Sequence, residues 1–366
     1  MKEKIKGIII ICSILITIVG ALISEITPIG AYFAVVGFFT LITTILISRI
    51  TNEAKIKYKN NVKKINVKPD DKIEELYTKI SEKNMEELEK YRKKLRNITV
   101  CAIIMTILFF LTGALFSVKD NGIYMYIIFI FLLIFMVKLW NKQTRMKEEY
   151  KKKYKKEIVY RIIKSYDSEL RYSQAKRNEM KKEYKNSSFD KGVYDIIECD
   201  DYIEGNIDKE TIIRIIDINT YKKKGNKVQD VFTGIFANIN LNNKLEKTIK
   251  IVNNSKLKEV KNIELDNFNF ERYFDVYCKD KILATRVLTA EVMETMVSFY
   301  KKLEIKFEII LKDSNLYLRF YTGEMFEPNI FKNTIDKKQI YKHYNILKFV
   351  LEVSRKINNV VSEIDV

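Results

Sequence analysis

Four long apolar stretches without a charged residue constrain this 366-residue chain more than any other feature. They cover residues 7–24, 29–47, 98–118 and 122–137. Each has roughly 16 to 21 residues, so a helix rising 1.5 Å per residue would approach or match a hydrocarbon core of about 30 Å. The pattern predicts four transmembrane helices. A cleavable signal peptide is the alternative for the first stretch, but a second stretch follows at once.

The links inside each pair are short, residues 25–28 and 119–121, so each pair is predicted to be a hairpin. Lysine and arginine crowd the outer ends of both hairpins, whereas the two turns carry only Lys119. Basic flanks stay in the cytoplasm. The abundance of Lys, Ile and Asn is typical of an AT-rich bacterial genome. We therefore expect a multi-pass protein of the bacterial plasma membrane with both termini cytoplasmic.

Helical spacing continues beyond the second hairpin on both sides. Residues 69–97 are predicted to form a helix that runs into the third span, because no breaker precedes residue 98. After the fourth span, apolar and aromatic positions recur at helical spacing. These are Tyr150, Tyr154, Ile158, Ile162 and Tyr166. We expect the two extensions to pair as a cytoplasmic helical stalk; the alternative is two independent surface helices.

After about residue 188 the pattern changes from helical to alternating. Short connections, such as the turn at Gly225 and a hairpin across residues 313–315, predict an antiparallel β-rich domain. A long amphipathic helix closes it from about residue 336 to 362. The strand number also fits a small half-open barrel of pleckstrin-homology type. The predicted fold class is thus an α+β membrane protein with four transmembrane helices in two hairpins.

The expected domains follow directly from these patterns. They are a transmembrane hairpin at 1–50, a cytoplasmic helical segment at 51–97, a second transmembrane hairpin at 98–140, a basic juxtamembrane helix at 141–187 and a cytoplasmic α+β domain at 188–366.

Residues 270–289, FERYFDVYCKDKILATRVLT, gather acids, a cysteine and an arginine. We interpret them as a strand-to-helix corner in which Asp280 caps a turn and Thr289 caps a helix. Asp275, Asp280 and Arg286 are the candidate ligand or corner residues. A role in phosphate binding or acid–base catalysis would need geometry that the sequence does not supply.

No catalytic, cofactor-binding or metal-ligating set is predicted. The chain has four cysteines without CxxC spacing and a single histidine, His343, and it has no Walker, GxGxxG, HExxH or GxSxG motif. We therefore expect that the protein has no cofactor, and the absence of these motifs favours a protein that is not an enzyme.

The spacing F-x-x-x-F-x-V-Y-x-x-D-x-x-x-A-x-x-x-L-T from residue 270 to 289 resembles the signature of bacterial membrane proteins grouped as domain-of-unknown-function family 3137. Residues 157–172, 201–205, 231–236 and 326–328 support the resemblance. It implies spans followed by a cytoplasmic domain and brings no known reaction, so no catalytic residue is carried over. The extra first hairpin departs from the two-span plan of the family.

The basic run between residues 138 and 164 favours anionic lipid headgroups of the bilayer as a partner, or serves topology alone. Nucleic acid is a poor fit because no aromatic RNA-binding motif accompanies the charge. We expect the cytoplasmic domain to be a binding, scaffold or regulatory module for an unidentified protein or small ligand, and a homo-oligomer is compatible. The alternatives are a membrane-anchored enzyme, and a transporter or channel subunit.

Overall fold

The computed structural model describes residues 74–78, 84–116, 123–174, 178–190, 192–208, 211–225, 227–254, 263–334 and 337–364. These residues belong to two compact units, which are described one at a time. The first contains residues 87–152 and the second contains residues 153–364 together with the described residues before Glu87. The predicted spans at 7–24 and 29–47 lie outside the described residues.

The first unit is a helical hairpin. Its helices are α4 (Asn84–Phe116) and α5 (Ile123–Tyr154). The rings of Tyr91 and Tyr150 stack with centroids 6.4 Å apart, and Trp140 Nε1 donates a hydrogen bond to Thr106 Oγ1 at 3.0 Å. The first contact joins the start of α4 to the end of α5, and the second joins a later residue of α4 to an earlier residue of α5, so the helices are antiparallel. The predicted pairing of the two helical extensions is therefore confirmed.

The prediction of transmembrane helices is wrong for this unit. Among the described residues, no helix combines the length and apolar character needed to cross a membrane. Charged residues occupy the first part of α4 and the last part of α5. The uncharged part of α5 before Lys138 spans only about 22 Å at 1.5 Å per residue, against a hydrocarbon core of about 30 Å. The four-span fold class is corrected accordingly.

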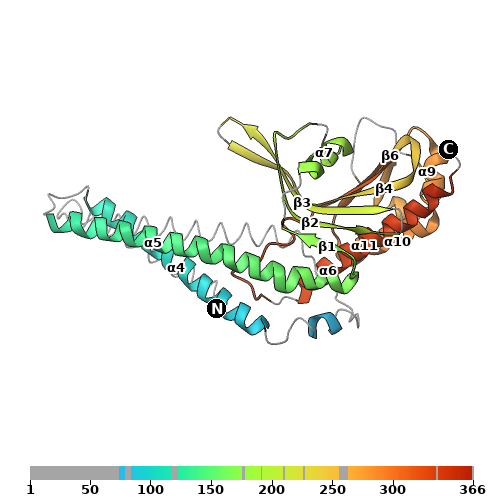
Figure 1. Cartoon of the computed structure of the whole chain (residues 1–366). Helices are drawn as coiled ribbons and strands as arrows, with labels where there is room; N and C mark the ends of the chain where they lie inside the picture. Colours follow the sequence, from blue (N-terminus) through green and yellow to red (C-terminus); the bar gives the residue numbers. More distant parts are fainter. Residues whose placement is uncertain are drawn as a thin grey trace. The chain divides into compact units, whose positions relative to one another are not determined.

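The second unit is built on one antiparallel six-stranded sheet (Figure 1). Its strands are β1 (Arg171–Ser173), β2 (Ile196–Asn206), β3 (Ile212–Lys224), β4 (Lys227–Asn253), β5 (Phe274–Tyr277) and β6 (Phe307–Phe320). The order is β1-β2-β3-β4-β5, with β6 paired to β4. Gly225, with φ of 59°, makes the predicted tight turn between β3 and β4. The described strands form a single sheet in which β1 and β5 are the two ends of the order and do not pair with each other.

Strand β6 doubles back on itself at its middle. The N–H of Tyr321 donates to the carbonyl of Lys306 at 2.9 Å, and the rings of Phe307 and Phe320 lie 5.7 Å apart. Asp313, with φ of 54°, stands at the reversal. The hairpin predicted across residues 313–315 is therefore confirmed, and β6 has two arms, Phe307 to Lys312 and Asn315 to Phe320.

Strand β4 follows this hairpin around its tip. Its residues Ile235 to Asn240 pair with the second arm of β6, Leu245 pairs with Asp313, and Ile249 to Val252 pair with the first arm. The register shifts twice on the way, between Asn240 and Leu245 and between Leu245 and Ile249. The β6 hairpin thus lies between two segments of β4, and each segment pairs with one arm of the hairpin.

Helices cover the two faces of the sheet unequally. Besides a short helix at residues 74–78, the helical elements of this unit are η1 (Lys155–Val159, a π-helix), α6 (Tyr160–Tyr166), α7 (Asn178–Ser187), α8 (Phe268–Glu271), α9 (Lys281–Val287), α10 (Ala290–Leu303) and α11 (Lys337–Ser362). Figure 1 shows α7 on one side of the sheet and α6, α10 and α11 on the other.

The face under α10 and α11 carries the aromatic core. Phe299 and Phe349 stack at 4.0 Å, and Phe307 and Phe320 contact Phe349 at 5.1 and 5.9 Å. These rings come from α10, α11 and both arms of β6. Helix α7 is shorter than α11 and covers only part of the opposite face, over an apolar cluster that includes Tyr184 and Phe236. The rest of that face is available for a site.

Candidate functional site

Strand register builds a polar floor on the α7 face of the sheet. Asn238 of β4 pairs with Arg214 of β3 on one side and with Tyr317 of β6 on the other. Two residues further along β4, Asn240 pairs with Asn315. Because side chains two apart on a strand point to the same face, these two rows form one surface.

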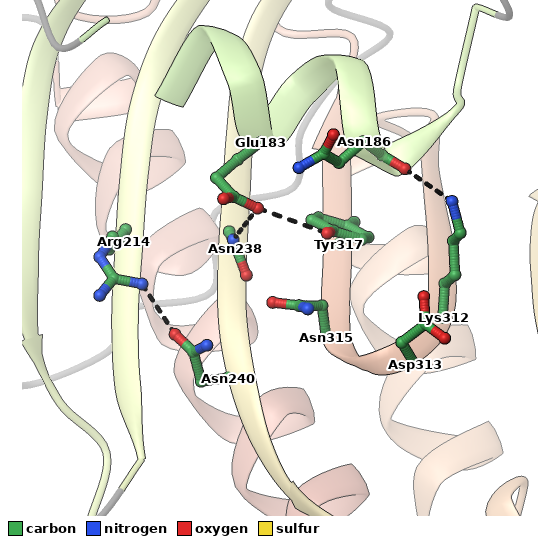
Figure 2. A pocket seen from close by; sticks show the side chains of 9 residues that line it. All are labelled: Glu183, Asn186, Arg214, Asn238, Asn240, Lys312, Asp313, Asn315 and Tyr317. Carbon is green, nitrogen blue, oxygen red and sulfur yellow. Dashed lines mark hydrogen bonds between the residues drawn. The ribbon is translucent and has the colours of Figure 1, made fainter. Parts of the chain in front are cut away.

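Helix α7 and the tip of the β6 hairpin complete a pocket over this floor. Glu183 and Asn186 come from α7, and Lys312 and Asp313 come from the hairpin tip (Figure 2). The cavity has a volume of about 420 Å³. This lies in the lower part of the range of about 300 to 1,000 Å³ that is usual for small-molecule sites. Every residue that lines the pocket has a polar side chain.

Most charged groups of the pocket already have partners. Glu183 Oε2 accepts hydrogen bonds from Asn238 Nδ2 at 2.9 Å and from the Tyr317 hydroxyl at 3.4 Å. Arg214 donates to Asn240 Oδ1 at 2.7 Å and lies 3.5 Å from a Glu204 oxygen. Burial and the neighbouring Glu183 raise the pKa of Tyr317 above its usual value. The pocket is therefore held in shape by its own hydrogen bonds.

One buried polar atom of the pocket is unsatisfied. Asn238 is 1% exposed, and its Oδ1 is buried with no hydrogen-bond partner among the described residues. The amide cannot turn away freely, because its Nδ2 donates to Glu183. A buried acceptor without a donor costs about 1 to 3 kcal/mol. A ligand that brings a hydrogen-bond donor to this atom would remove that cost.

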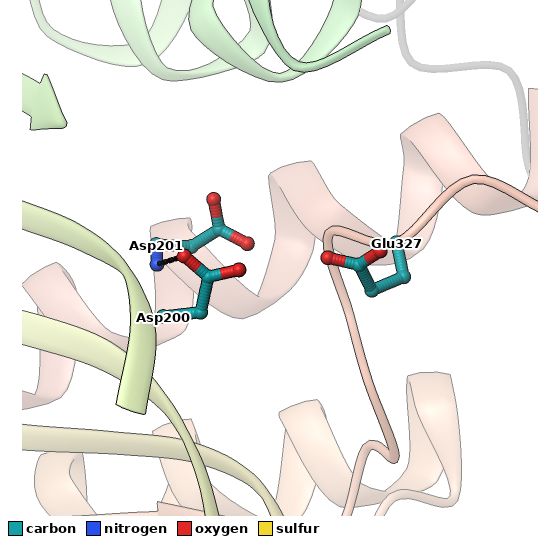
Figure 3. A group of neighbouring side chains, drawn as sticks. All are labelled: Asp200, Asp201 and Glu327. Carbon is teal, nitrogen blue, oxygen red and sulfur yellow. Dashed lines mark hydrogen bonds between the residues drawn. The ribbon is translucent and has the colours of Figure 1, made fainter. Parts of the chain in front are cut away.

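A second cluster of ionisable side chains lies on the opposite face of the sheet. The carboxylates of Asp200, Asp201 and Glu327 have ligand atoms within 4.8 Å of one another (Figure 3). Lys155 of η1 reaches all three, with Nζ at 3.0 Å from Asp200 Oδ2, 2.5 Å from Asp201 Oδ2 and 2.9 Å from Glu327 Oε1. The Tyr172 hydroxyl donates to the remaining Asp201 oxygen at 2.5 Å.

Two irregularities of the backbone bring these groups together. The π-turn of η1 interrupts the helix that continues from α5 into α6 and contains Lys155, which is fully buried. In β2 a register shift follows Asp200, and Asp201 adopts a φ of 55°. This bulge sets the two aspartates side by side, with the N–H of Asp201 donating to Asp200 Oδ1 at 3.0 Å. Such departures from regular geometry occur often at functional sites.

Three carboxylates of this kind are the described residues best suited to hold a divalent cation. Burial lowers the pKa of Lys155, but the charges of Asp201 and Glu327 outweigh it, so the pKa lies above its usual value. The ammonium group therefore stays charged and takes the place between the carboxylates that a metal ion would need. The arrangement is that of an internally satisfied ion-pair cluster.

The candidate residues from the sequence are placed at a corner, as expected, and are not assembled into a site. Asp275 lies on β5, opposite Val252. Asp280 is the N-cap of α9 and accepts a hydrogen bond from the N–H of Leu283 at 3.0 Å. Arg286 is exposed in the last turn of α9. Within residues 263–334, which are described throughout, no ion pair joins Asp280 to Arg286.

The cysteines and the histidine are also apart from the pocket. Cys101, Cys199 and Cys278 are free thiols. Burial raises the pKa of Cys199 to about 12. His343 on α11 is fully buried against Phe326, and burial lowers its pKa to about 3.

One local sequence pattern indicates the pocket floor, although it is not a catalytic motif. In the segment NINLN, asparagine alternates with isoleucine and leucine over Asn238, Ile239, Asn240, Leu241 and Asn242. This period of two places amides on one face of a strand and apolar side chains on the other. The contribution of α7 and of the hairpin tip has no comparable local signal, since it depends on tertiary contacts.

Residues 230–359 match the family model described as "Protein of unknown function (DUF3137)", so the predicted resemblance is confirmed over that range. The match contains the corner at residues 270–289 and most of the pocket floor. No curated relative matches the chain.

One solved structure is similar to the chain, the crystal structure of the mycobacterial trehalose monomycolate transport factor A, TtfA. Identity is 8%, the TM-score is 0.31, and the similarity covers 52% of this chain and 86% of that chain. A TM-score this low carries no argument about the fold or the function of this chain.

Proposed function

We propose that the α+β unit is a binding module whose ligand enters the polar pocket between α7 and the β6 hairpin. The observation that carries the proposal is the buried, unpartnered Oδ1 of Asn238 at the pocket floor. Buried polar groups in folded proteins are nearly always satisfied, so an exception inside a cavity is a natural contact point for a ligand.

The composition of the lining favours binding over chemistry. The pocket has no histidine, cysteine or serine among its lining residues. Its acid Glu183 already accepts two hydrogen bonds from neighbouring side chains. These groups fix an orientation for a ligand, whereas a nucleophile paired with a base is what covalent catalysis would need.

The proposal is tested by screening small polar metabolites against the purified full-length chain by thermal unfolding. A ligand that binds only the folded state raises the unfolding free energy by about 2.7 kcal/mol at a hundred times its Kd. The Asn238→Leu variant removes the unpartnered acceptor. Asn269→Leu is the matched control, because it makes the same change at an exposed position on α8.

Stabilisation by a compound that is lost in Asn238→Leu and kept in Asn269→Leu supports the proposal. A screen in which no compound depends on Asn238 contradicts it. Conversion of a compound by the wild-type chain, lost with Asn238→Leu, would favour an enzyme instead.

A further inference from the structure

We infer that the pocket takes a neutral polyhydroxylated ligand, a sugar or a cyclic polyol. This inference rests on the proposed binding function and adds the chemical class of the ligand. Three features of the pocket carry it: the balance of its charges, the kind of hydrogen-bonding groups that line it and the spacing of those groups.

The charges of the lining cancel. Arg214 and Lys312 contribute two positive charges, and Glu183 and Asp313 contribute two negative ones. An anion that approached the two cations would be repelled by the two carboxylates. A cation that approached the carboxylates would be repelled by Arg214 and Lys312. The pocket therefore has no net electrostatic preference for a charged ligand.

The cations are also engaged within the protein. Arg214 has contacts with Asn240 and Glu204, and Lys312 Nζ donates to the backbone carbonyl of Asn186 at 3.1 Å. A phosphate or carboxylate would have to displace these partners. The buried side-chain atom of the pocket that lacks a partner among the described residues is the neutral amide oxygen of Asn238, and a hydroxyl can donate to it without burying a charge.

The hydrogen-bonding character of the lining matches hydroxyl groups. Four asparagines line the pocket, Asn186, Asn238, Asn240 and Asn315. Each amide offers both donors and an acceptor, and each hydroxyl is likewise both a donor and an acceptor. A ligand with several adjacent hydroxyls can therefore satisfy such a surface at many points, as an apolar or purely accepting ligand cannot.

The floor repeats these groups at a spacing suited to a ring. Neighbouring strands lie about 4.8 Å apart and same-face residues of one strand about 6.8 Å apart. Asn238, Asn240 and Asn315 occupy three corners of this grid, as Figure 2 shows. Hydroxyls around a six-membered ring are spread over a comparable area, so one face of a sugar can lie along the floor.

The test uses ligand-observed saturation-transfer NMR with the full-length chain. The neutral probes are glucose and myo-inositol. The charged probes are methyl phosphate, whose methyl protons report binding, and spermidine; serine serves as a zwitterion that carries both charges and one hydroxyl. The variants are Asn238→Leu, Asn315→Leu and the exposed control Asn269→Leu.

The expected result is saturation transfer to glucose or myo-inositol, an affinity lowered at least tenfold by Asn238→Leu and by Asn315→Leu, and no change with Asn269→Leu. Asn315 lies at the end of a hairpin arm, so its variant keeps the test valid if Asn238→Leu does not fold.

Two results would overturn the inference, and they differ in what they leave standing. If methyl phosphate, spermidine or serine binds through Asn238 and the polyols do not, the ligand class is wrong and the binding function remains. If no probe binds and the metabolite screen also finds no ligand, both proposals fail together.

Discussion

Arg319 and Glu308 face each other across the two arms of β6, with Arg319 Nη2 at 3.1 and 3.0 Å from the two carboxylate oxygens. The other terminal nitrogen donates to Asp190 at 2.6 Å. The guanidinium lies over the rings of Phe189 and Phe232, 4.6 and 5.2 Å from their centroids. This buried cation therefore ties the β6 hairpin to the segment that follows α7.

Replacing Arg319 with methionine should lower the free energy of unfolding by about 3 to 5 kcal/mol, since two carboxylates would lose their buried partner. Urea unfolding of the purified chain measures the change. Arg214→Met is the matched control, because Arg214 is more exposed and should cost about 1 kcal/mol or less. Equal losses for the two variants would contradict the prediction.

Replacing Lys155 with methionine should cost a similar 3 to 5 kcal/mol, because the carboxylates of Asp200, Asp201 and Glu327 would then repel one another without a cation. The neighbouring Lys156 is exposed, so Lys156→Met should change stability by about 0.5 kcal/mol or less. The comparison is made by chemical denaturation at neutral pH. A stable Lys155→Met variant at low ionic strength would show that the cluster does not need its ammonium group.

His343 should make the stability of the chain fall in acid. Its pKa is lowered from about 6.5 to about 3 in the folded state, mainly by burial and then by Lys342. The unfolded chain therefore takes up a proton between these values that the folded chain refuses, so this contribution is complete above pH 6.5 and is lost as pH falls toward 3.

The measurement compares wild type with His343→Leu. Between pH 7 and pH 5 the wild type should lose about 2 kcal/mol relative to the variant. His343 is the only histidine of the chain, so no other imidazole contributes to the difference. Parallel pH profiles for the two proteins would refute the assignment.

Asp280 should act as a helix cap and not as a ligand. Its Oδ1 accepts the N–H of Leu283 at the start of α9, so Asp280→Ala should cost about 1 kcal/mol, and Asp280→Ser should retain most of the stability. Arg286→Ala, at an exposed position, should have little effect on unfolding. Loss of ligand binding in Arg286→Ala, with stability unchanged, would restore the corner as a candidate site.

Local patterns predicted the elements of the α+β unit well, for identifiable reasons. Thr289 caps α10 as expected, with its hydroxyl accepting the N–H of Val292, and α11 ends at Ser362 as its amphipathic pattern indicated. Gly225 and the Asp-Ser-Asn turn marked the two hairpins. These signals act over a few residues, where propensity and turn chemistry decide the structure.

The wrong prediction, that of membrane-spanning helices, rests on one local property, the absence of charged residues. The lack of charge in residues 98–118 and 122–137 favours membrane spans when these stretches are considered alone, whereas α4 and α5 each also contain a densely charged part. The lipid contacts, the oligomeric state and the cellular location expected from that interpretation stay predictions.

The sequence alone does not reveal the candidate site, for a related reason. Asn238 and Asn240 come from β4, Glu183 from α7 and Asn315 from β6, so their meeting depends on strand register and on the reversal at Asp313. Glu327 lies 126 residues beyond Asp201 in the sequence. No local pattern indicates that both carboxylates contact the same lysine, Lys155.

The course of β4 around the β6 hairpin also bears on how the chain is assembled during synthesis. Strand β3 and the first part of β4 can pair as soon as they leave the ribosome. The backbone groups of β4 that pair with β6 have no strand partner until residues Phe307 to Phe320 have been synthesised. Those groups are the ones a foreign strand could pair with. A chain that ends before residue 307 would therefore be prone to aggregate. In the full chain the two arms of the β6 hairpin pair with these parts of β4.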